Sequence, residues 1–252
     1  MKHRLDSLLV NAGLAPTTEK ALALILAGQV TVAGHRADKP GLLLNEGTEI
    51  TLKESACPFV SRGGMKLDKA LDTFQIDPNG LICADIGAST GGFTDCLLQH
   101  GATKVYAIDV GYGQLAWSLR QDSRVIVMER TNARHLTPAM FPDPINLAVI
   151  DAAFISLKLL LPPLLPLFKQ HPIAILALIK PQFEVDRGAT VSGVVSEPAL
   201  HQQVIDNILT FCHGLGLTDH GVTDSPILGP KGNKEFLVYL TGTGPLSIEL
   251  SP

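Results

Sequence analysis

Charged residues stand at the ends of two apolar segments of this sequence, where acid–base or electrostatic chemistry is possible. Asp151 ends the segment INLAVID, and Lys180 ends the segment IAILALIK. The carboxyl ends of strands in an open α/β sheet converge on the ligand crevice, so we expect both side chains to face it. A buried charge is costly unless it is paired, which argues against accidental placement. Asp151 and Lys180 therefore form either a catalytic pair or a structural salt bridge.

A third charged residue, Glu235, opens the apolar segment EFLVYLTG after the glycine-rich turn GPKGN. A turn of this composition could carry the carboxylate over the same crevice. The alternative is an ordinary solvated start of a strand. We expect Glu235 to join Asp151 and Lys180.

A glycine-rich turn, DIGASTGG, links another apolar segment to a helix. Glycines let the backbone approach a ligand closely, and the N-terminus of a helix offers free N–H groups. The pattern GxxxxGK[ST] of a phosphate loop is absent, because Phe93 follows Gly92. The dinucleotide pattern GxGxxG is absent as well, because Ser89 stands two places after Gly87.

A ligand with an ammonium group and a carboxylate beside a nucleoside fits this turn, and S-adenosyl-L-methionine is such a ligand. Asp85 can face its ammonium group, and the backbone N–H groups of the turn can face its carboxylate. Asp109 ends the next strand and can accept both ribose hydroxyls, while Asn132 can contact adenine. The alternative is an ordinary α/β turn with N-capping acids. The predicted cofactor-binding residues are Asp85, Gly87, Ser89, Thr90, Gly91, Gly92, Asp109 and Asn132.

The segments that must position these residues alternate between apolar strands and stretches of helix length. The strand candidates are LICADIGA, KVYAIDVG, RVIVMER, INLAVID and IAILALIK. Such continuous apolar runs indicate a parallel sheet buried on both faces. EFLVYLTG is expected as an antiparallel strand at or near an edge, and PPLLPLF as a helix end and loop. We predict an α/β fold with a doubly wound, mostly parallel, seven-stranded sheet.

The first 54 residues have a different pattern, typical of a small α+β domain. Leu5, Leu8 and Leu9 mark one helical face, and Thr17 or Thr18 can cap a second helix that runs to Ala27. The segments QVTVAG and NEGTEITL are expected to form strands and turns. We place this domain at residues 1–54, a linker at 55–62, the α/β domain at 63–245 and a tail at 246–252.

Composition excludes several classes of protein. The chain has 252 residues, of which 46% are hydrophobic, and a formal net charge of −4, so global disorder is excluded and any basic surface must be local. Four cysteines lack ligand spacing and are expected to be reduced and mostly buried, and no metal is expected. Neither a signal peptide nor an uninterrupted apolar span is visible. We expect a soluble cytoplasmic protein, monomeric or weakly homo-oligomeric.

Six motifs together carry a specific resemblance. They are SRGGMKLDKAL, DIGASTGGFTD, YAIDVGYGQL, DAAFISL, KPQFE and SPILGPKGNKEFL, in this order. In this combination the chain resembles the TlyA family, the hemolysin-A-like ribosomal RNA 2'-O-methyltransferases. The resemblance implies an S4-like RNA-binding domain followed by an FtsJ-type catalytic domain. It further implies methyl transfer to a ribose 2'-hydroxyl, that of cytidine, in ribosomal RNA or ribosomal subunits.

The family's catalytic tetrad of Lys, Asp, Lys and Glu falls on Lys66, Asp151, Lys180 and Glu235. The resemblance alone selects Lys66, and Lys69 in the same motif has no counterpart. We hypothesise that Lys180 acts as base or oxyanion stabiliser while Lys66 positions the hydroxyl. A neighbouring cation would favour neutral Lys180, and the two carboxylates would hold the amines.

Two positions depart from the family pattern, namely Ala152 and Leu228, which stand where Ser and Lys are usual. The second departure removes a positive charge that could touch RNA. Residues 1–54 carry no formal net charge, so a basic strip for RNA must be assembled from individual residues. Those expected are Lys2, Arg4, Lys20, Arg36 and Arg62.

The long loop at residues 183–198 could close over the target nucleotide. Two other functions stay open from the sequence: a non-catalytic RNA-binding or ribosome-assembly factor, and a membrane-active cytolysin.

Overall fold

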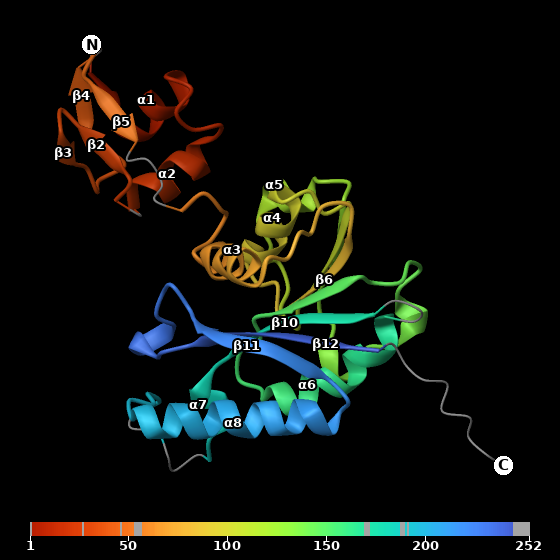
Figure 1. Cartoon of the computed structure of the whole chain (residues 1–252). Coiled ribbons are helices and arrows are strands. Elements are labelled where there is room, and N and C mark those ends of the chain that lie inside the picture. Colours follow the sequence, from red (N-terminus) through yellow and green to blue (C-terminus); the bar gives the residue numbers. More distant parts are fainter. Residues whose placement is uncertain are drawn as a thin grey trace. The chain divides into compact units, whose positions relative to one another are not determined.

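The computed structural model describes residues 2–26, 28–45, 47–52, 57–168, 172–186, 190 and 192–243 (Figure 1). The chain divides into two compact units, residues 1–58 and 59–252. The expected end of a helix at Ala27, residues 55–56 of the expected linker and the expected tail at 246–252 lie outside the described residues. The finer domain limits given above remain predictions.

The first unit consists of two short helices and five very short strands. Strand β1 pairs antiparallel with β4, and a second sheet has the order β3-β2-β5. The elements are β1 (Lys2–Arg4), α1 (Leu5–Asn11), α2 (Thr18–Leu26), β2 (Val30–Val32), β3 (His35–Arg36), β4 (Leu43–Asn45) and β5 (Ile50–Leu52). The sequence predicted both helices, β2 and β5. It missed β1, β3 and β4, whose two or three residues are too few for a detectable alternation.

A small apolar core holds the first unit together. Leu5, Leu9, Ala21, Ile25 and Val30 are buried in it. The start of α2 is capped by Thr17, whose side-chain oxygen accepts a hydrogen bond from the Lys20 N–H at 3.2 Å. This cap satisfies one of the free N–H groups of the first turn.

The second unit is built on one seven-stranded sheet with the order β11-β12-β10-β9-β6-β7-β8 (Figure 1). Strands β10, β9, β6, β7 and β8 are parallel to one another, whereas β12 runs antiparallel to them. Strand β11 pairs antiparallel with β12 and so has the direction of the five parallel strands. The strands are β6 (Ile82–Ile86), β7 (Lys104–Ile108), β8 (Val125–Met128), β9 (Leu147–Ile150), β10 (Ile173–Ile179), β11 (Thr218–Asp224) and β12 (Phe236–Gly242). The prediction of a mostly parallel seven-stranded sheet is confirmed.

Strand β11 is the outermost strand, and the sequence did not indicate its position. Its residues, TDHGVTD, are mostly polar and half-buried or exposed, as an edge strand allows. Strand β12, expected at or near an edge, lies one place inside it. The apolar content of β12 follows from this inner position, where both faces of the sheet are covered.

Helices cover both faces of this sheet, so the fold is doubly wound. They are α3 (Gly63–Phe74), α4 (Gly92–Gln99), α5 (Trp117–Arg120), α6 (Leu157–Leu164), α7 (Pro181–Glu184) and α8 (Pro198–Gly214). Successive strand residues alternate between the two cores: Ile175 and Ala177 pack with α6 and α8, and Leu176 packs with α3 and α4. Helix α3 buries one face against the sheet, with Leu67 and Ala70 fully enclosed.

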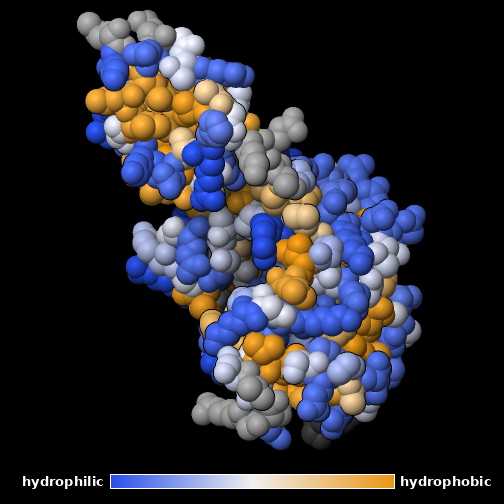
Figure 2. All heavy atoms as spheres, turned by 90° about the vertical axis from the view of Figure 1, so that its left-hand side faces the viewer, coloured by the Kyte–Doolittle hydropathy of each residue, from blue (hydrophilic) through white to orange (hydrophobic). Residues whose placement is uncertain are grey.

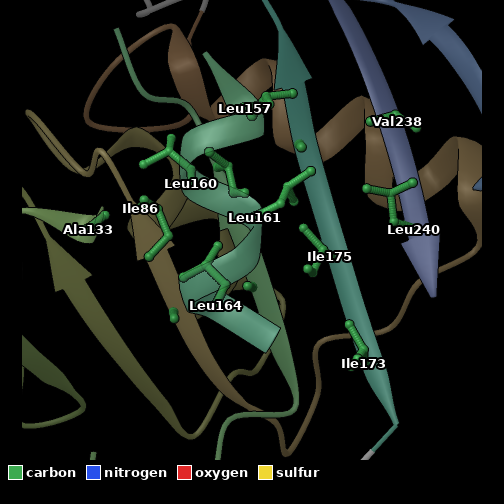
Figure 3. Close-up of a cluster of buried hydrophobic side chains, with 14 of the residues drawn as sticks. Ile86, Ala133, Leu157, Leu160, Leu161, Leu164, Ile173, Ile175, Val238 and Leu240 are labelled. Carbon is green, nitrogen blue, oxygen red and sulfur yellow. The ribbon is translucent and has the colours of Figure 1, made fainter. Parts of the chain in front are cut away.

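Helix α6 buries four leucines against the parallel strands. Figure 3 shows Leu157, Leu160, Leu161 and Leu164 packed against Ile86 and β10. Its last turn contains Pro162 and Pro163, and a short 3₁₀ helix, Leu165–Phe168, follows. The expected helix end is therefore present, and the expected loop is partly helical.

Cys83, Cys96 and Cys212 are free thiols and are buried as expected, while Cys57 is half-buried. Burial raises the pKa of the Cys83 thiol to about 12 and that of Cys212 to about 11, so both stay protonated and unreactive at neutral pH. Across the described residues, no helix is both long and apolar enough to span a bilayer.

Candidate active site

The predicted catalytic residues meet at the carboxyl ends of the parallel strands. Asp151 follows β9 directly, and Lys180 follows β10. Lys66 lies on α3, and Glu235 immediately precedes β12. Because β9, β10 and β12 are adjacent in the sheet, three of these residues approach one another without any unusual backbone.

The four side chains form a continuous row of alternating charge. Lys180 Nζ lies 2.5 Å from Asp151 Oδ1, and Lys66 Nζ lies 3.4 Å from Asp151 Oδ2. Lys66 Nζ also donates to Glu235 Oε2 at 2.7 Å. The side chains of Lys66, Asp151 and Lys180 are 9%, 18% and 10% exposed, and that of Glu235 is fully buried. Each buried charge is therefore compensated by a neighbour of opposite sign.

Two cavities adjoin this row and share a wall. The larger, about 510 Å³, is lined by Lys66, Asp151 and Lys180 and also by the turn at residues 227–230. The smaller, about 340 Å³, is lined by Asp109, Asn132 and the segment 151–155. Gly87, Ser89, Asp151 and Ala153 line both. Glu235 lines neither cavity, and its carboxylate lies against Lys66 and against Gly229 of the larger cavity's wall.

The glycine-rich turn connects β6 to α4 between the two cavities. Gly87 has φ +86° and lies so close to β9 that a Cβ atom would stand 2.8 Å from the Asp151 carbonyl oxygen. Gly91 has φ +97°, and a Cβ there would collide with Leu119. Both positions therefore need glycine. Thr90 and Gly92 line the larger cavity, and Gly91 lines neither.

Asp109 and Asn132 stand at the rim of the smaller cavity. Asp109 accepts hydrogen bonds from the N–H groups of Ser89, at 2.8 Å, and Gly111, at 2.7 Å. These bonds fix the carboxylate and tie the glycine-rich turn to the end of β7. Asn132 accepts from the Arg134 N–H at 3.1 Å, so its oxygen caps a short helix while its amide nitrogen carries two further donors.

Asp85 takes a different place from the other predicted cofactor residues. It is fully buried beneath the turn and lines neither cavity. Its Oδ2 accepts from Thr94 Oγ1 at 2.6 Å, and its Oδ1 has no hydrogen-bond partner among the described residues. Burial raises the pKa of this carboxyl from the usual 3.8 to about 7. Its contact with a ligand ammonium group remains a prediction.

Gly229 and Glu184 belong to the site and were not singled out from the sequence, whereas Leu228 was. Leu228 and Gly229 form part of the wall of the larger cavity, and the guanidinium of Arg62 donates to the Leu228 carbonyl at 3.3 Å. Glu184 accepts from Ser156 Oγ at 2.6 Å and from the Leu157 N–H at 2.8 Å. Burial raises the pKa of Glu184, and these two bonds oppose that rise. The position of Glu184, four residues after Lys180 at the end of a strand, was the sequence signal that could have identified it.

The basic residues predicted to contact RNA are mostly exposed in the unit to which each belongs. Lys2, Lys20, Arg36 and Arg62 lie on the surface. Arg4 is engaged already, because its guanidinium donates to both oxygens of Asp6, at 3.1 Å and 2.6 Å. Arg4 therefore has less charge to offer a phosphate than the sequence suggested.

The loop expected to close over a nucleotide is anchored in its described part. The amide nitrogen of Asn233 donates to the Gly193 carbonyl at 3.0 Å, and its oxygen accepts from the Val195 N–H at 3.1 Å. Lys231 Nζ donates to the Ser192 carbonyl at 3.0 Å. The segment 192–195 is thus tied to the turn that lines the larger cavity, while residues 187–189 and 191 lie outside the described residues.

Comparison with known proteins gives matches over nearly the whole chain. The FtsJ-like methyltransferase family matches residues 59–241, and the S4 domain matches residues 3–50. The 16S/23S rRNA (cytidine-2'-O)-methyltransferase TlyA of Mycobacterium tuberculosis is 45% identical, over 95% of this chain and 90% of its own. Hemolysin A of Brachyspira hyodysenteriae is 39% identical, over 94% and 98%. A solved structure from Streptococcus thermophilus is 44% identical, with a TM-score of 0.75, over 96% and 89%.

Removing the carboxyl group of Asp85 tests the electrostatics beneath the turn. The pKa of Asp85 is higher in the folded protein than the usual 3.8 expected in the unfolded chain. Protonated Asp85 therefore contributes its full stabilisation of the folded state at pH values below the usual pKa, and this stabilisation is lost as the pH rises through about 7. Between pH 5 and pH 8 the loss amounts to about 3 kcal/mol. We expect Asp85→Asn to show a free energy of unfolding that falls less over this range, measured by urea denaturation of the free protein.

Asp77→Asn serves as the matched control, because Asp77 is exposed and lies on a turn of the same unit. This variant should follow the pH dependence of the wild type. A pH dependence that is the same in Asp85→Asn and the wild type would contradict the raised pKa.

Proposed function

This chain belongs to the TlyA family of FtsJ-like methyltransferases, which carry an S4 domain, and we propose that it methylates a ribose 2'-hydroxyl of ribosomal RNA. The proposed target is a cytidine, as the printed name of the Mycobacterium tuberculosis relative indicates for that protein. A cytoplasmic location follows from a ribosomal substrate. The observation that carries the proposal is the row of Lys180, Asp151, Lys66 and Glu235 at the wall of a cavity.

The residues around the smaller cavity fit S-adenosyl-L-methionine. The Asp109 carboxylate lies at the cavity where ribose hydroxyls would need acceptors, and the Asn132 amide lies where adenine would need a donor. Asp85 Oδ1 is buried beneath the turn without a hydrogen-bond partner in the described part of the chain, and a nearby ammonium group would favour the ionised form of this carboxyl. When bound, the cofactor supplies an electrophilic methyl group.

The larger cavity is the proposed place for the target nucleotide. It opens beside the shared wall, so a ribose there would lie next to Lys66 and Lys180. A ribose hydroxyl is a poor nucleophile until its proton leaves, and in-line attack requires close alignment. Lys66 and Lys180 both offer N–H donors that can orient the hydroxyl oxygen. The proposed nucleotide is splayed out of its helix so that the sugar reaches the cavity.

We assign the roles of the four residues by what each contacts. Lys180 removes the hydroxyl proton or stabilises the oxyanion, and Lys66 positions the hydroxyl. Asp151 contacts both lysines and fixes their separation. Glu235 contacts Lys66 and lines neither cavity, which makes it a positioning residue.

Replacement of Lys180 tests the proposed chemistry. We expect Lys180→Met to lower kcat for methyl transfer about a hundredfold or more, since general acid–base catalysis contributes that much. S-adenosylhomocysteine binding should be unaffected, because Lys180 lines the larger cavity and not the smaller one. The measurement is transfer of labelled methyl groups to purified ribosomal subunits and to free ribosomal RNA, followed by mapping of the modified nucleotide.

Lys69→Met is the matched control, because Lys69 lies on the same helix as Lys66 and outside the row. It should retain the wild-type kcat. An unchanged rate in Lys180→Met would exclude the assigned role. Binding of ribosomal RNA without any methyl transfer by the wild type would favour a non-catalytic assembly factor, and lysis of erythrocytes would favour a cytolysin.

Charge reversal in the first unit tests the proposed contact with RNA. Lys20 and Arg36 are exposed and have no salt bridge to an acidic side chain in the described part of the chain. We expect Lys20→Glu combined with Arg36→Glu to weaken binding to ribosomal RNA. Each lost phosphate contact should reduce the slope of log K against log salt by about 0.7–0.9. Filter binding across a range of salt concentrations measures this slope.

Lys39→Glu is the control, since Lys39 is an exposed lysine of the same unit outside the predicted strip. An equal slope in the double variant and in Lys39→Glu would rule out Lys20 and Arg36 as specific contacts.

A further inference from the structure

Glu184 is a carboxylate near the site that has no part in the chemistry proposed above. It ends α7, shortly after Lys180. Its two oxygens accept hydrogen bonds from Ser156 Oγ and from the Leu157 N–H. Ser156 Oγ also accepts from the Lys158 N–H at 3.1 Å. Glu184 thus satisfies the free N-terminus of α6 from a different element.

An aromatic contact joins the same two segments a second time. The rings of Phe154 and Phe183 have centroids 5.2 Å apart. Phe154 has φ +64°, a conformation that is costly for a side chain of this size, and it is 90% exposed. A residue in such a conformation persists only where its surroundings hold it. Here Asp151 on one side of Phe154 is bonded to Lys180, and Ser156 on the other side is bonded to Glu184.

Segment 151–156 is therefore fixed at its two ends by segment 180–184. At one end Asp151 pairs with Lys180, and at the other Ser156 pairs with Glu184. The residues between them include Ala153, which lines both cavities. We name the contacts of Glu184 with Ser156 and Leu157, together with the Phe154–Phe183 contact, the clasp.

The clasp is anchored in the apolar core. Leu157 begins α6 and is buried against β10, as Figure 3 shows. Lys180 is the N-cap residue of α7, and its carbonyl accepts from the Phe183 N–H at 2.9 Å. A short helix thus connects Glu184 to Lys180. A displacement of Glu184 from the fixed start of α6 would be transmitted to Lys180.

We propose that Glu184 is a positioning residue that sets the separation of Asp151 and Lys180 and holds the wall shared by the two cavities. The expected effect of Glu184 on kcat rests on the proposed methyl transfer. The expected effect on the segment 151–156 can be measured in the free protein, whatever reaction it catalyses. Glu184 acts through its hydrogen bonds with Ser156 and with the Leu157 N–H, so a neutral side chain that can bond to both partners should replace it.

Two substitutions separate these bonds from the negative charge. Glu184→Ala removes both acceptors. In Glu184→Gln the amide oxygen can accept from the Leu157 N–H, and the amide nitrogen can donate to Ser156 Oγ. We expect Glu184→Ala to lower kcat about tenfold or more per binding site, counted by titration with S-adenosylhomocysteine, because small misplacements of reacting groups have effects of this size. Glu184→Gln should stay within about threefold of the wild type.

Amide hydrogen exchange of the free protein gives a readout without catalysis. We expect faster exchange in residues 151–158 of Glu184→Ala and near wild-type exchange in Glu184→Gln. Ser156→Ala removes one of the two bonds and should give an intermediate result, which keeps the proposal testable if Glu184→Ala does not fold.

Asp143→Asn is the matched control. Asp143 Oδ2 accepts hydrogen bonds from Lys104 Nζ, at 2.5 Å, and from the Tyr106 hydroxyl, at 3.0 Å, near the start of β7 and so at the end of the parallel strands opposite to the site. Its loss should leave kcat per binding site and exchange at residues 151–158 unchanged.

Three outcomes would overturn the proposal. One is a Glu184→Ala protein with a lowered Tm but wild-type kcat per site and wild-type exchange at residues 151–158. A second is a Glu184→Gln protein as impaired as Glu184→Ala, which would assign the effect to charge. A third is an Asp143→Asn protein whose kcat per site and exchange at residues 151–158 change as much as those of Glu184→Ala. If the wild type transferred no methyl group to ribosomal RNA, the proposed function would fail, and the exchange data would still decide for or against the clasp.

Discussion

The pairing of Asp151 with Lys66 and Lys180 determines how the elements around the site of the second unit must be arranged. A charge that is mostly shielded from water needs a compensating partner, and removal of one partner leaves the other uncompensated. Asp151 touches Lys180 and Lys66, and Lys66 in turn touches Glu235. The row therefore needs all of its members. It also requires that β9, β10 and β12 be neighbours and that α3 lie over their ends.

The glycine-rich turn packs so closely on the end of β9 that Asp151 of the row lines a cavity on either side. Gly87 lets the first turn lie against the end of β9, where a Cβ atom would meet the Asp151 carbonyl. As a result Asp151 lines both cavities, and a group transferred between them would pass beside its side chain. The rigid start of α6 and the bonds from Glu184 hold the opposite end of the same segment. Position at this site is thus imposed by the core, through short connections.

The parallel sheet could be predicted because its strands are continuous apolar segments that end in polar residues. The same endings identified Asp151, Lys180 and Asp109. Lys66 has no such signal, because a lysine at the border of a helical stripe is ordinary, and only the resemblance selected it. Strand β11 is polar, so its sequence resembles a loop. The burial of Asp85 depends on how α4 covers the turn, and the partners of Glu184 lie on a different helix, so neither was visible in local sequence.

The charges of the row explain why recognition of RNA must be located elsewhere. Two lysines and two carboxylates cancel, so the row offers a phosphate little net attraction. Leu228 at the wall of the larger cavity contributes no charge either. Affinity for a polyanion must then come from exposed cations outside the row, such as Lys20 and Arg36 of the first unit. A net charge of −4 for the whole chain does not prevent this, because a few exposed cations can form a local basic surface while the charges of the row cancel one another.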